Sequence, residues 1–181
     1  MLIQEMTTDA CVALLARARF CRLACSHEGQ PYITPMHCLY DDNYLYGFTT
    51  LGKKITWMRE NPLVCVLAEE VTSPQDWYSV IVLGKYEELS DGAAHGVHRQ
   101  HAYDLLQRRA VWWEPGYVET VISGKDRPMK FLYFRIHIEK ISGHQGVPDT
   151  VPDPGLPADR QGIPGWIRKV FRRSEHHGGK L

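Results

Sequence analysis

The residues most suited to chemistry in this sequence are Lys53 and Lys54, which follow Gly52 at the predicted start of a helix. An apolar strand precedes them, so residues 49–62 (TTLGKKITWMRENP) are predicted to form strand, turn and helix. The first N–H groups of a helix have no partner within it, and the helix dipole favours negative charge there. Lysines at this end oppose the dipole, and a bound anion would compensate them. The segment therefore indicates a phosphate site, with a solvated first turn as the alternative.

Three histidines, His95, His98 and His101, recur every three residues in a second predicted helix at residues 91–109. They would lie near one helix face and could bind a metal. No carboxylate or cysteine completes the set at a suitable spacing, so we favour a solvated helix face and expect no metal.

The five cysteines make an odd number, and no pair has the C-x-x-C spacing of a zinc ribbon or a redox motif. Small thiols are common in apolar cores. We expect all five to be reduced core residues: Cys11, Cys21, Cys25, Cys38 and Cys65.

Composition places the chain among ordinary globular proteins, because 44% of its 181 residues are hydrophobic and 23% are charged. Basic and acidic residues both number 21, so no overall field attracts nucleic acid. No run reaches the roughly 18 apolar residues of a membrane span, and the first residues do not have the pattern of a signal peptide. We expect a cytoplasmic protein without a nucleic-acid partner or a membrane span.

The hydrophobic pattern predicts an α+β, mainly β fold. Runs rich in β-branched and aromatic residues predict six strands, at residues 20–26, 31–40, 44–50, 63–70, 77–89 and 129–143. Three helices are predicted: one capped by Thr7 or Thr8 and ending at residues 17–19, one from Lys53 to about Asn61, and the histidine helix. Gly84 inside a long strand suggests a bulge or bend, as at a barrel corner. These elements indicate a small antiparallel barrel.

The composition changes after residue 145, so we predict a domain at residues 1–145 and an extended tail at 146–181. Five of the eleven prolines lie in this tail, which shows no periodicity. Within it, residues 166–173 (WIRKVFRR) are amphipathic at helical spacing. This short basic helix is expected to dock onto its own or a partner subunit, with an anionic membrane surface as the alternative.

Five short segments occur in an order that matches a known family. They are RLA at 22–24, G-x-P-Y-x-x-P at 29–35, G-K-K-x-x-x-x-R-x-N-P at 52–62, W-x-S-V-x-V-x-G at 77–84 and F-R-I-x-I-x-x-I-S-G at 134–143. In these segments the chain resembles the pyridoxamine 5′-phosphate oxidase-like flavoproteins with the FMN-binding split barrel. Within that family it is most similar to the branch related to nitroimidazole-resistance proteins. The resemblance covers about residues 6–145 and excludes the tail.

The resemblance implies a six-stranded split barrel that forms a homodimer with FMN at the interface. The residues that would hold the phosphate are Thr49, Thr50, Lys53 and Lys54. Those that would run beside the isoalloxazine ring through backbone contacts are Pro35, Met36, His37 and Cys38. Trp77 and Ser79 would approach the flavin from the W-x-S-V segment.

The implied function is an FMN-dependent oxidoreductase that reduces a small aromatic or nitroaromatic compound with electrons from NAD(P)H. No G-x-G-x-x-G segment is present, so a nicotinamide would bind transiently in the flavin cleft. The arginine and histidine groups that grip the substrate phosphate in pyridoxamine phosphate oxidases are missing from the tail, so that activity is not inferred. The alternatives are a flavin- or haem-binding carrier or sensor without turnover, and a deazaflavin-dependent reductase.

Four further side chains have two interpretations each. His37 could donate a proton to a substrate or ligate haem iron, or could be a plain barrel residue. Trp112 and Trp113 could be core or interface anchors, or could line a substrate pocket at the mouth of the flavin cavity. Arg135 could be a structural ion-pair partner or a cation beside an anionic flavin.

Overall fold

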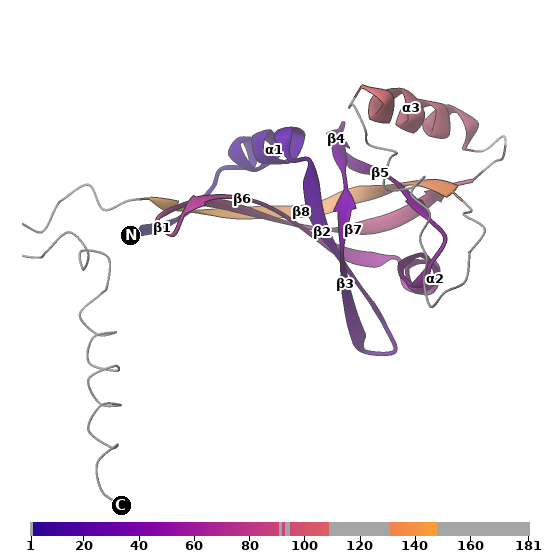
Figure 1. Ribbon diagram of the computed structural model, residues 1–181, viewed down its shortest axis with the longest axis horizontal. Helices are drawn as coiled ribbons and strands as arrows, with labels where there is room; N and C mark the ends of the chain where they lie inside the picture. The colour runs from indigo at the N-terminus through magenta and orange to yellow at the C-terminus, as the bar shows by residue number, and fades with distance from the viewer. Residues whose placement is uncertain (1, 91, 93–94, 109–130, 148–181) are drawn as a thin grey trace, which may run out of the picture.

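The computed structural model describes residues 2–90, 92, 95–108 and 131–147. The N-terminal elements are β1 (Leu2–Glu5), α1 (Thr8–Arg17), β2 (Phe20–His27), β3 (Gln30–His37), β4 (Leu39–Asp41) and β5 (Tyr44–Thr50). They are followed by α2 (Lys53–Glu60), β6 (Leu63–Ser73), β7 (Asp76–Leu89), α3 (Gly96–Gln107) and β8 (Phe131–Val147). Every strand pair is antiparallel, and the strands form one curved sheet flanked by helices (Figure 1). The predicted α+β, mainly β class is confirmed.

The sheet is a barrel that does not close. Its strand order is β3-β2-β6-β7-β8-β5-β4, and β1 is added on β8. The strands at the two ends of this order, β3 and β4, are neighbours in sequence, and only Cys38 separates them. The chain therefore passes from one end of the sheet to the other within a single residue. In the described chain, no ladder joins β3 to β4, which makes the architecture a split barrel.

The number of strands differs from the prediction, because the described residues form eight strands instead of six. The predicted strand at residues 31–40 is divided into β3 and β4, and β1 was not predicted. Pro31 and Pro35 lie within β3 and suit its place in the sheet. Proline has no N–H to donate, so β3 is suited to an edge position where it pairs only with β2.

Two tight turns have the backbone conformation that their residues favour. Glu28 and Gly29 join β2 to β3 with φ of 49° and 78°. Asp42 and Asn43 join β4 to β5 with φ of 42° and 64°. Positive φ at both central positions is typical of two-residue hairpin turns, in which glycine, asparagine and aspartate are preferred.

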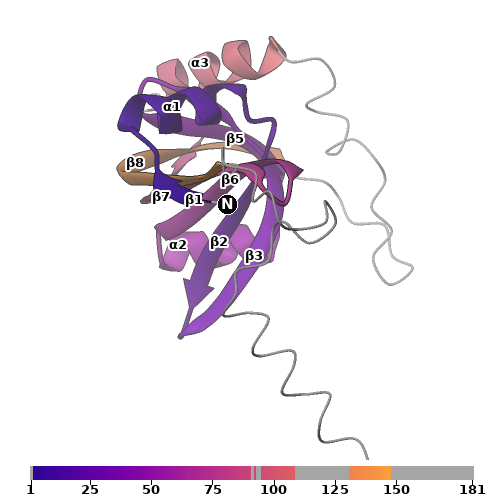
Figure 2. The ribbon, with the colours of Figure 1, turned by 90° about the vertical axis from the view of Figure 1, so that its left-hand side faces the viewer.

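The helices cover different parts of the sheet. α1 and α3 lie on one side of it and α2 lies on the other, beside the β2–β3 hairpin (Figures 1 and 2). The main core takes buried residues from both α1 and α2, including Leu14, Leu15, Ile55 and Met58. α3 covers a second cluster made of Leu39, Tyr46, Leu89, Ala102, Leu105 and Leu106. The predicted irregularity at Gly84 is present as a register shift between β7 and β8.

None of the helices within the described ranges is long and apolar enough to cross a membrane.

Candidate functional site: the start of helix α2

Leu51 and Gly52 connect β5 directly to α2. The backbone of Gly52, the N-cap residue, is extended, and no side chain accepts a hydrogen bond at this cap. The first turn of α2 also contains no acidic residue. A helix start with two lysines, no side-chain cap and no acidic neighbour is electrostatically suited to an anion.

Lys54 is half-buried, and burial lowers the pKa of its ammonium group because desolvation disfavours the charged form. Cys25 of β2 lies near enough to this ammonium group to interact with it electrostatically. Among the described residues, no carboxylate lies within ion-pair distance of Lys54. A desolvated cation without a negative partner is unfavourable by itself, so this position gains most from a bound anion.

Lys53 occupies a different environment. Its ammonium nitrogen lies 4.3 Å from the centre of the Trp57 ring and 5.0 Å from the centre of the Tyr32 ring. Trp57 is one helical turn further along α2, and Tyr32 lies on β3. The two lysines are therefore not equivalent: Lys54 is held against β2, while Lys53 is exposed and lies on aromatic rings.

Thr49 and Thr50 end β5 just before this helix start. Thr49 is 9% exposed and is the one buried polar side chain among the described residues, while Thr50 is half-buried. The Thr49 hydroxyl donates a hydrogen bond to the carbonyl oxygen of Thr50 at 3.4 Å, near the limit for such a bond. The chain thus brings two hydroxyls and two lysines to one end of the barrel.

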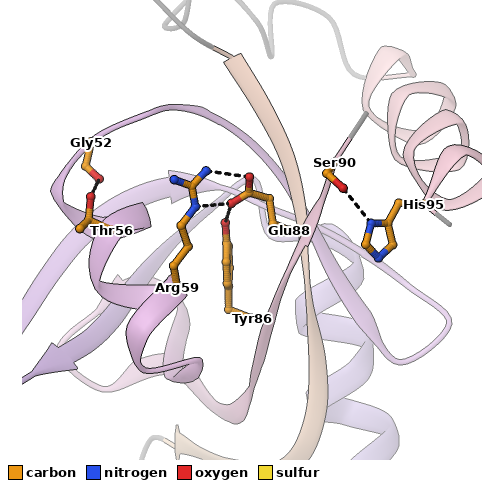
Figure 3. A network of polar contacts seen from close by, with 7 residues as sticks. All are labelled: Gly52, Thr56, Arg59, Tyr86, Glu88, Ser90 and His95. Carbon is orange, nitrogen blue, oxygen red and sulfur yellow. Dashed lines mark hydrogen bonds and ion pairs between the residues drawn. The ribbon is translucent and has the colours of Figure 1, made fainter. Parts of the chain in front are cut away.

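The far end of α2 is fixed to the sheet (Figure 3). Arg59 donates two hydrogen bonds to the carboxylate of Glu88 on β7, each 2.8 Å long. The Tyr86 hydroxyl donates to the same carboxylate at 3.0 Å. Burial, followed by the nearby negative charge of Glu88, raises the pKa of Tyr86 well above its usual value, so this phenol stays a donor. These bonds fix the helix whose first turn carries Lys53 and Lys54.

The stretch predicted to border the isoalloxazine ring lies at the end of β3. Pro35 is exposed, His37 is half-buried, and Met36 and Cys38 are buried. The His37 ring lies 4.1 Å from the ring of Phe20, its partner in the β2–β3 ladder.

Cys38 forms a disulfide with Cys21 of β2. The prediction that all five cysteines are reduced is therefore wrong for this pair, while Cys11, Cys25 and Cys65 are free. Cys21 pairs with Met36 in the ladder, and the Cα atoms of Cys21 and Cys38 are 6.2 Å apart, within reach of a disulfide. The spacing of the two cysteines in the sequence does not predict this disulfide, because it is the β2–β3 hairpin that brings their Cα atoms together.

Trp77 and Ser79 lie far from the start of α2 within one chain. They pair with Gly146 and His144 near the C-terminal end of β8, whereas Thr49 pairs with Leu132 near its N-terminal end. At about 3.3 Å per residue, roughly 40 Å of strand separates these positions. The β1 end of the sheet, to which they belong, is opposite α2 in Figure 1. The fold therefore does not bring Trp77 and Ser79 to the threonines and lysines of the same subunit.

The remaining candidates fall outside this region. Arg135 forms an ion pair with Glu87 at 2.6 Å and lies over the Tyr44 ring, which supports the structural interpretation. His101 contacts Asp41 at 2.8 Å, and among the described residues no group of three His, Cys, Asp or Glu could hold a metal. Trp112, Trp113 and the tail from residue 148 lie outside the described residues.

The aromatic neighbours of Lys53 were not found from the sequence. The spacing of Lys53 and Trp57 by four residues was an available signal, since such residues are neighbours on a helix. Nothing in the sequence indicated the contact between Lys53 and Tyr32, because it depends on how the β2–β3 hairpin packs against α2.

Comparisons with known proteins agree with this architecture. The family model described as pyridoxamine 5′-phosphate oxidase matches residues 7–145. An uncharacterized protein of Rhizobium meliloti is 35% identical over 145 residues, which cover 79% of this chain and 95% of the relative.

Two solved structures have a similar fold. A FAD-binding protein from Mesorhizobium loti has 38% identity and a TM-score of 0.66, with 82% of this chain and 99% of that chain covered. A putative 5-nitroimidazole antibiotic resistance protein from Bacteroides thetaiotaomicron has 18% identity and a TM-score of 0.57, with 80% and 89% covered. Because the family model spans most of the chain and the split barrel accompanies it, this chain belongs to the pyridoxamine 5′-phosphate oxidase family.

Proposed function

We propose that this protein binds a flavin nucleotide whose phosphate occupies the start of α2. The observation that carries the proposal is Lys54, a desolvated cation with no carboxylate partner among the described residues. A phosphate would supply the missing negative charge, and the hydroxyls of Thr49 and Thr50 and the first N–H groups of α2 would supply hydrogen bonds. The donors therefore fit the phosphate end of FMN. The FAD-binding relative from Mesorhizobium loti, at 38% identity, supports a flavin.

The proposed binding unit is a homodimer. Trp77 and Ser79 are too far from Lys54 to share one flavin within a subunit, but a second copy could place its own Trp77 and Ser79 beside the first copy's α2. The strand stretch from Pro35 to Cys38 would border the isoalloxazine ring, as the family resemblance implies.

An apolar outer face of the sheet supports this dimer. Ile33, Ala24, Cys65 and Leu83 are opposite one another across β3, β2, β6 and β7, so they share one face. Ile33 is 61% exposed and Leu83 is 46% exposed. The two residues between them, Ala24 and Cys65, are half-buried. An apolar row with such exposed ends is typical of a protein–protein interface.

The proposed activity is flavin-dependent reduction of a small aromatic or nitroaromatic compound with electrons from NAD(P)H. The flavin, when bound, would supply the electron transfer, and the protein would bind it and exclude competing reactions. His37 is half-buried at the end of β3, where its imidazole could deliver a proton to the substrate. Anaerobic addition of NADH or NADPH is expected to bleach the flavin absorbance, and retention of the absorbance with both donors would refute this electron source.

The decisive experiment is to denature the purified protein and identify the released chromophore by mass. FMN or FAD would support the proposal, and a deazaflavin would replace it with the deazaflavin-dependent reductase. Bound haem would favour a carrier or sensor, and loss of its Soret band in a His37→Ala variant would identify the ligand. A colourless protein that takes up no added flavin would overturn the proposal.

A further inference from the structure

Four side chains form a cationic aromatic cluster beside the proposed phosphate site: Lys53, Trp57, Tyr32 and His27. The ring of Trp57 is 5.7 Å from that of Tyr32, nearly edge-on, and 5.6 Å from that of His27. The ammonium group of Lys53 lies over both Trp57 and Tyr32. The cluster joins α2 to the β2–β3 hairpin and lies next to Lys54 in the sequence.

We infer that this cationic aromatic cluster is a subsite for the adenosine diphosphate half of FAD, and that it makes the protein prefer FAD to FMN. The inference rests on the proposed flavin function and extends it to a choice between the two nucleotides. In this arrangement Lys54 binds the phosphate that FMN and FAD share. Lys53, which the family resemblance assigned to that same phosphate, lies on the aromatic rings and binds the second phosphate instead, and the rings stack on the adenine.

The different environments of the two lysines support this division. Lys54 is half-buried without a carboxylate partner among the described residues, so a single phosphate already satisfies it. Lys53 is exposed and covers the Trp57 ring. A second phosphate would draw the ammonium group of Lys53 away from the ring and free that ring for a base, since purine bases stack well on aromatic side chains.

The polar groups at the other end of the cluster fit an adenine edge. His27 contacts Trp57 through its ring, and its Nδ1 atom lies 2.9 Å from a carboxylate oxygen of Glu60 on α2. Adenine presents a donor amino group, which the carboxylate of Glu60 can accept.

The test is calorimetric titration of flavin-free, full-length protein with FAD, FMN and ADP. We expect FAD to bind at least about ten-fold more tightly than FMN, and ADP alone to bind measurably. Quenching of tryptophan fluorescence by ADP, lost in a Trp57→Phe variant that still binds ADP, would identify the stacked ring without any activity assay.

Four variants separate the two phosphate positions. Lys53→Gln and Trp57→Leu are expected to weaken FAD by about ten-fold while leaving FMN within two-fold, and Trp57→Phe should keep the preference for FAD. Lys54→Gln, the matched control, should weaken both nucleotides. Circular dichroism establishes that each variant is folded, and Lys53→Gln, at an exposed position, remains informative if Trp57→Leu does not fold.

Equal affinity of the wild-type protein for FAD and FMN, or parallel loss of both in Lys53→Gln, would overturn the inference while the proposed flavin function stands. Failure to bind either nucleotide would instead refute the proposed function itself.

Discussion

Arg59 of α2 and Glu88 of β7 form a two-point ion pair, in which Nε and one terminal nitrogen of Arg59 each lie 2.8 Å from a carboxylate oxygen of Glu88. The same carboxylate accepts a hydrogen bond from the buried Tyr86. This contact attaches the C-terminal end of α2 to the longest hairpin of the sheet (Figure 3). The opposite end of the helix carries the two lysines.

Breaking this ion pair should lower stability modestly. The side chains of Arg59 and Glu88 are 47% and 26% exposed, so solvent screens much of their attraction. We expect a coupling of about 1 kcal/mol in a double-mutant cycle of Arg59→Ala and Glu88→Ala. A loss of stability of this size lowers the Tm of a single variant by about 2–4 °C. Glu88→Ala should cost more than Arg59→Ala, because it also removes the acceptor of Tyr86. Thermal denaturation of the four proteins measures the coupling, and additive effects would contradict it.

Removing the charge of Lys54 should stabilise the flavin-free protein while abolishing flavin retention. Lys54→Met replaces a desolvated cation with an apolar side chain of similar length, and we expect Tm near neutral pH to rise by about 2–4 °C. Equilibrium dialysis with the flavin should show loss of binding. Lys53→Met is the matched control, with little effect on Tm. A lower Tm in Lys54→Met would mean that the ammonium group has a stabilising partner.

The pH dependence of stability follows from the lowered pKa of Lys54. The unfolded chain, in which this pKa returns to 10.5, binds more protons than the folded one between the two pKa values. The stability of the flavin-free protein should therefore rise with pH from the lowered pKa up to about 10.5, relative to Lys54→Met. Urea denaturation of both proteins at several pH values measures this difference, which bound flavin should reduce.

The disulfide between Cys21 and Cys38 should contribute substantially to stability, because it closes a loop around the β2–β3 hairpin. For a loop of this size we expect the Cys21→Ser, Cys38→Ser double variant to lose about 3 kcal/mol. Alkylation of the denatured protein without reductant should label three of the five cysteines. Five labelled cysteines, in protein from cells lysed into the alkylating agent, would show that the disulfide is absent in the cell, as is usual in the cytoplasm.

A charge on the apolar outer face should prevent the proposed dimer. Leu83→Glu is expected to produce a monomer by sedimentation velocity and to weaken flavin binding at least about ten-fold, because the partner's share of the site is lost. Val97→Glu, at an 81% exposed position on α3, is the matched control and should remain dimeric. A wild-type protein that sediments as a monomer with bound flavin would refute the dimer.

The local features of this protein could be predicted from its sequence. Proline after Asn61 ends α2, Glu28 and Gly29 form a tight turn, and the alternation in residues 129–143 identifies the last strand with its buried Phe134 and Ile136. Each of these features depends on the conformational preference of a single residue or on the alternation of apolar and polar residues along a strand. The five ordered segments also identified the family, because they occur along the whole domain.

Only the tertiary structure decided which of these segments meet. It divided the predicted strand at residues 31–40 between the two ends of the sheet, joined Cys21 to Cys38, and placed Lys53 on Trp57 and Tyr32 while Lys54 lies beside Cys25. It also put Trp77 and Thr49 at opposite ends of β8. The physical reason is that strand register and helix packing depend on many weak contacts between residues that are distant in the sequence. The charges and conformational preferences that suit the start of α2 to an anion, by contrast, belong to residues that are neighbours in the sequence.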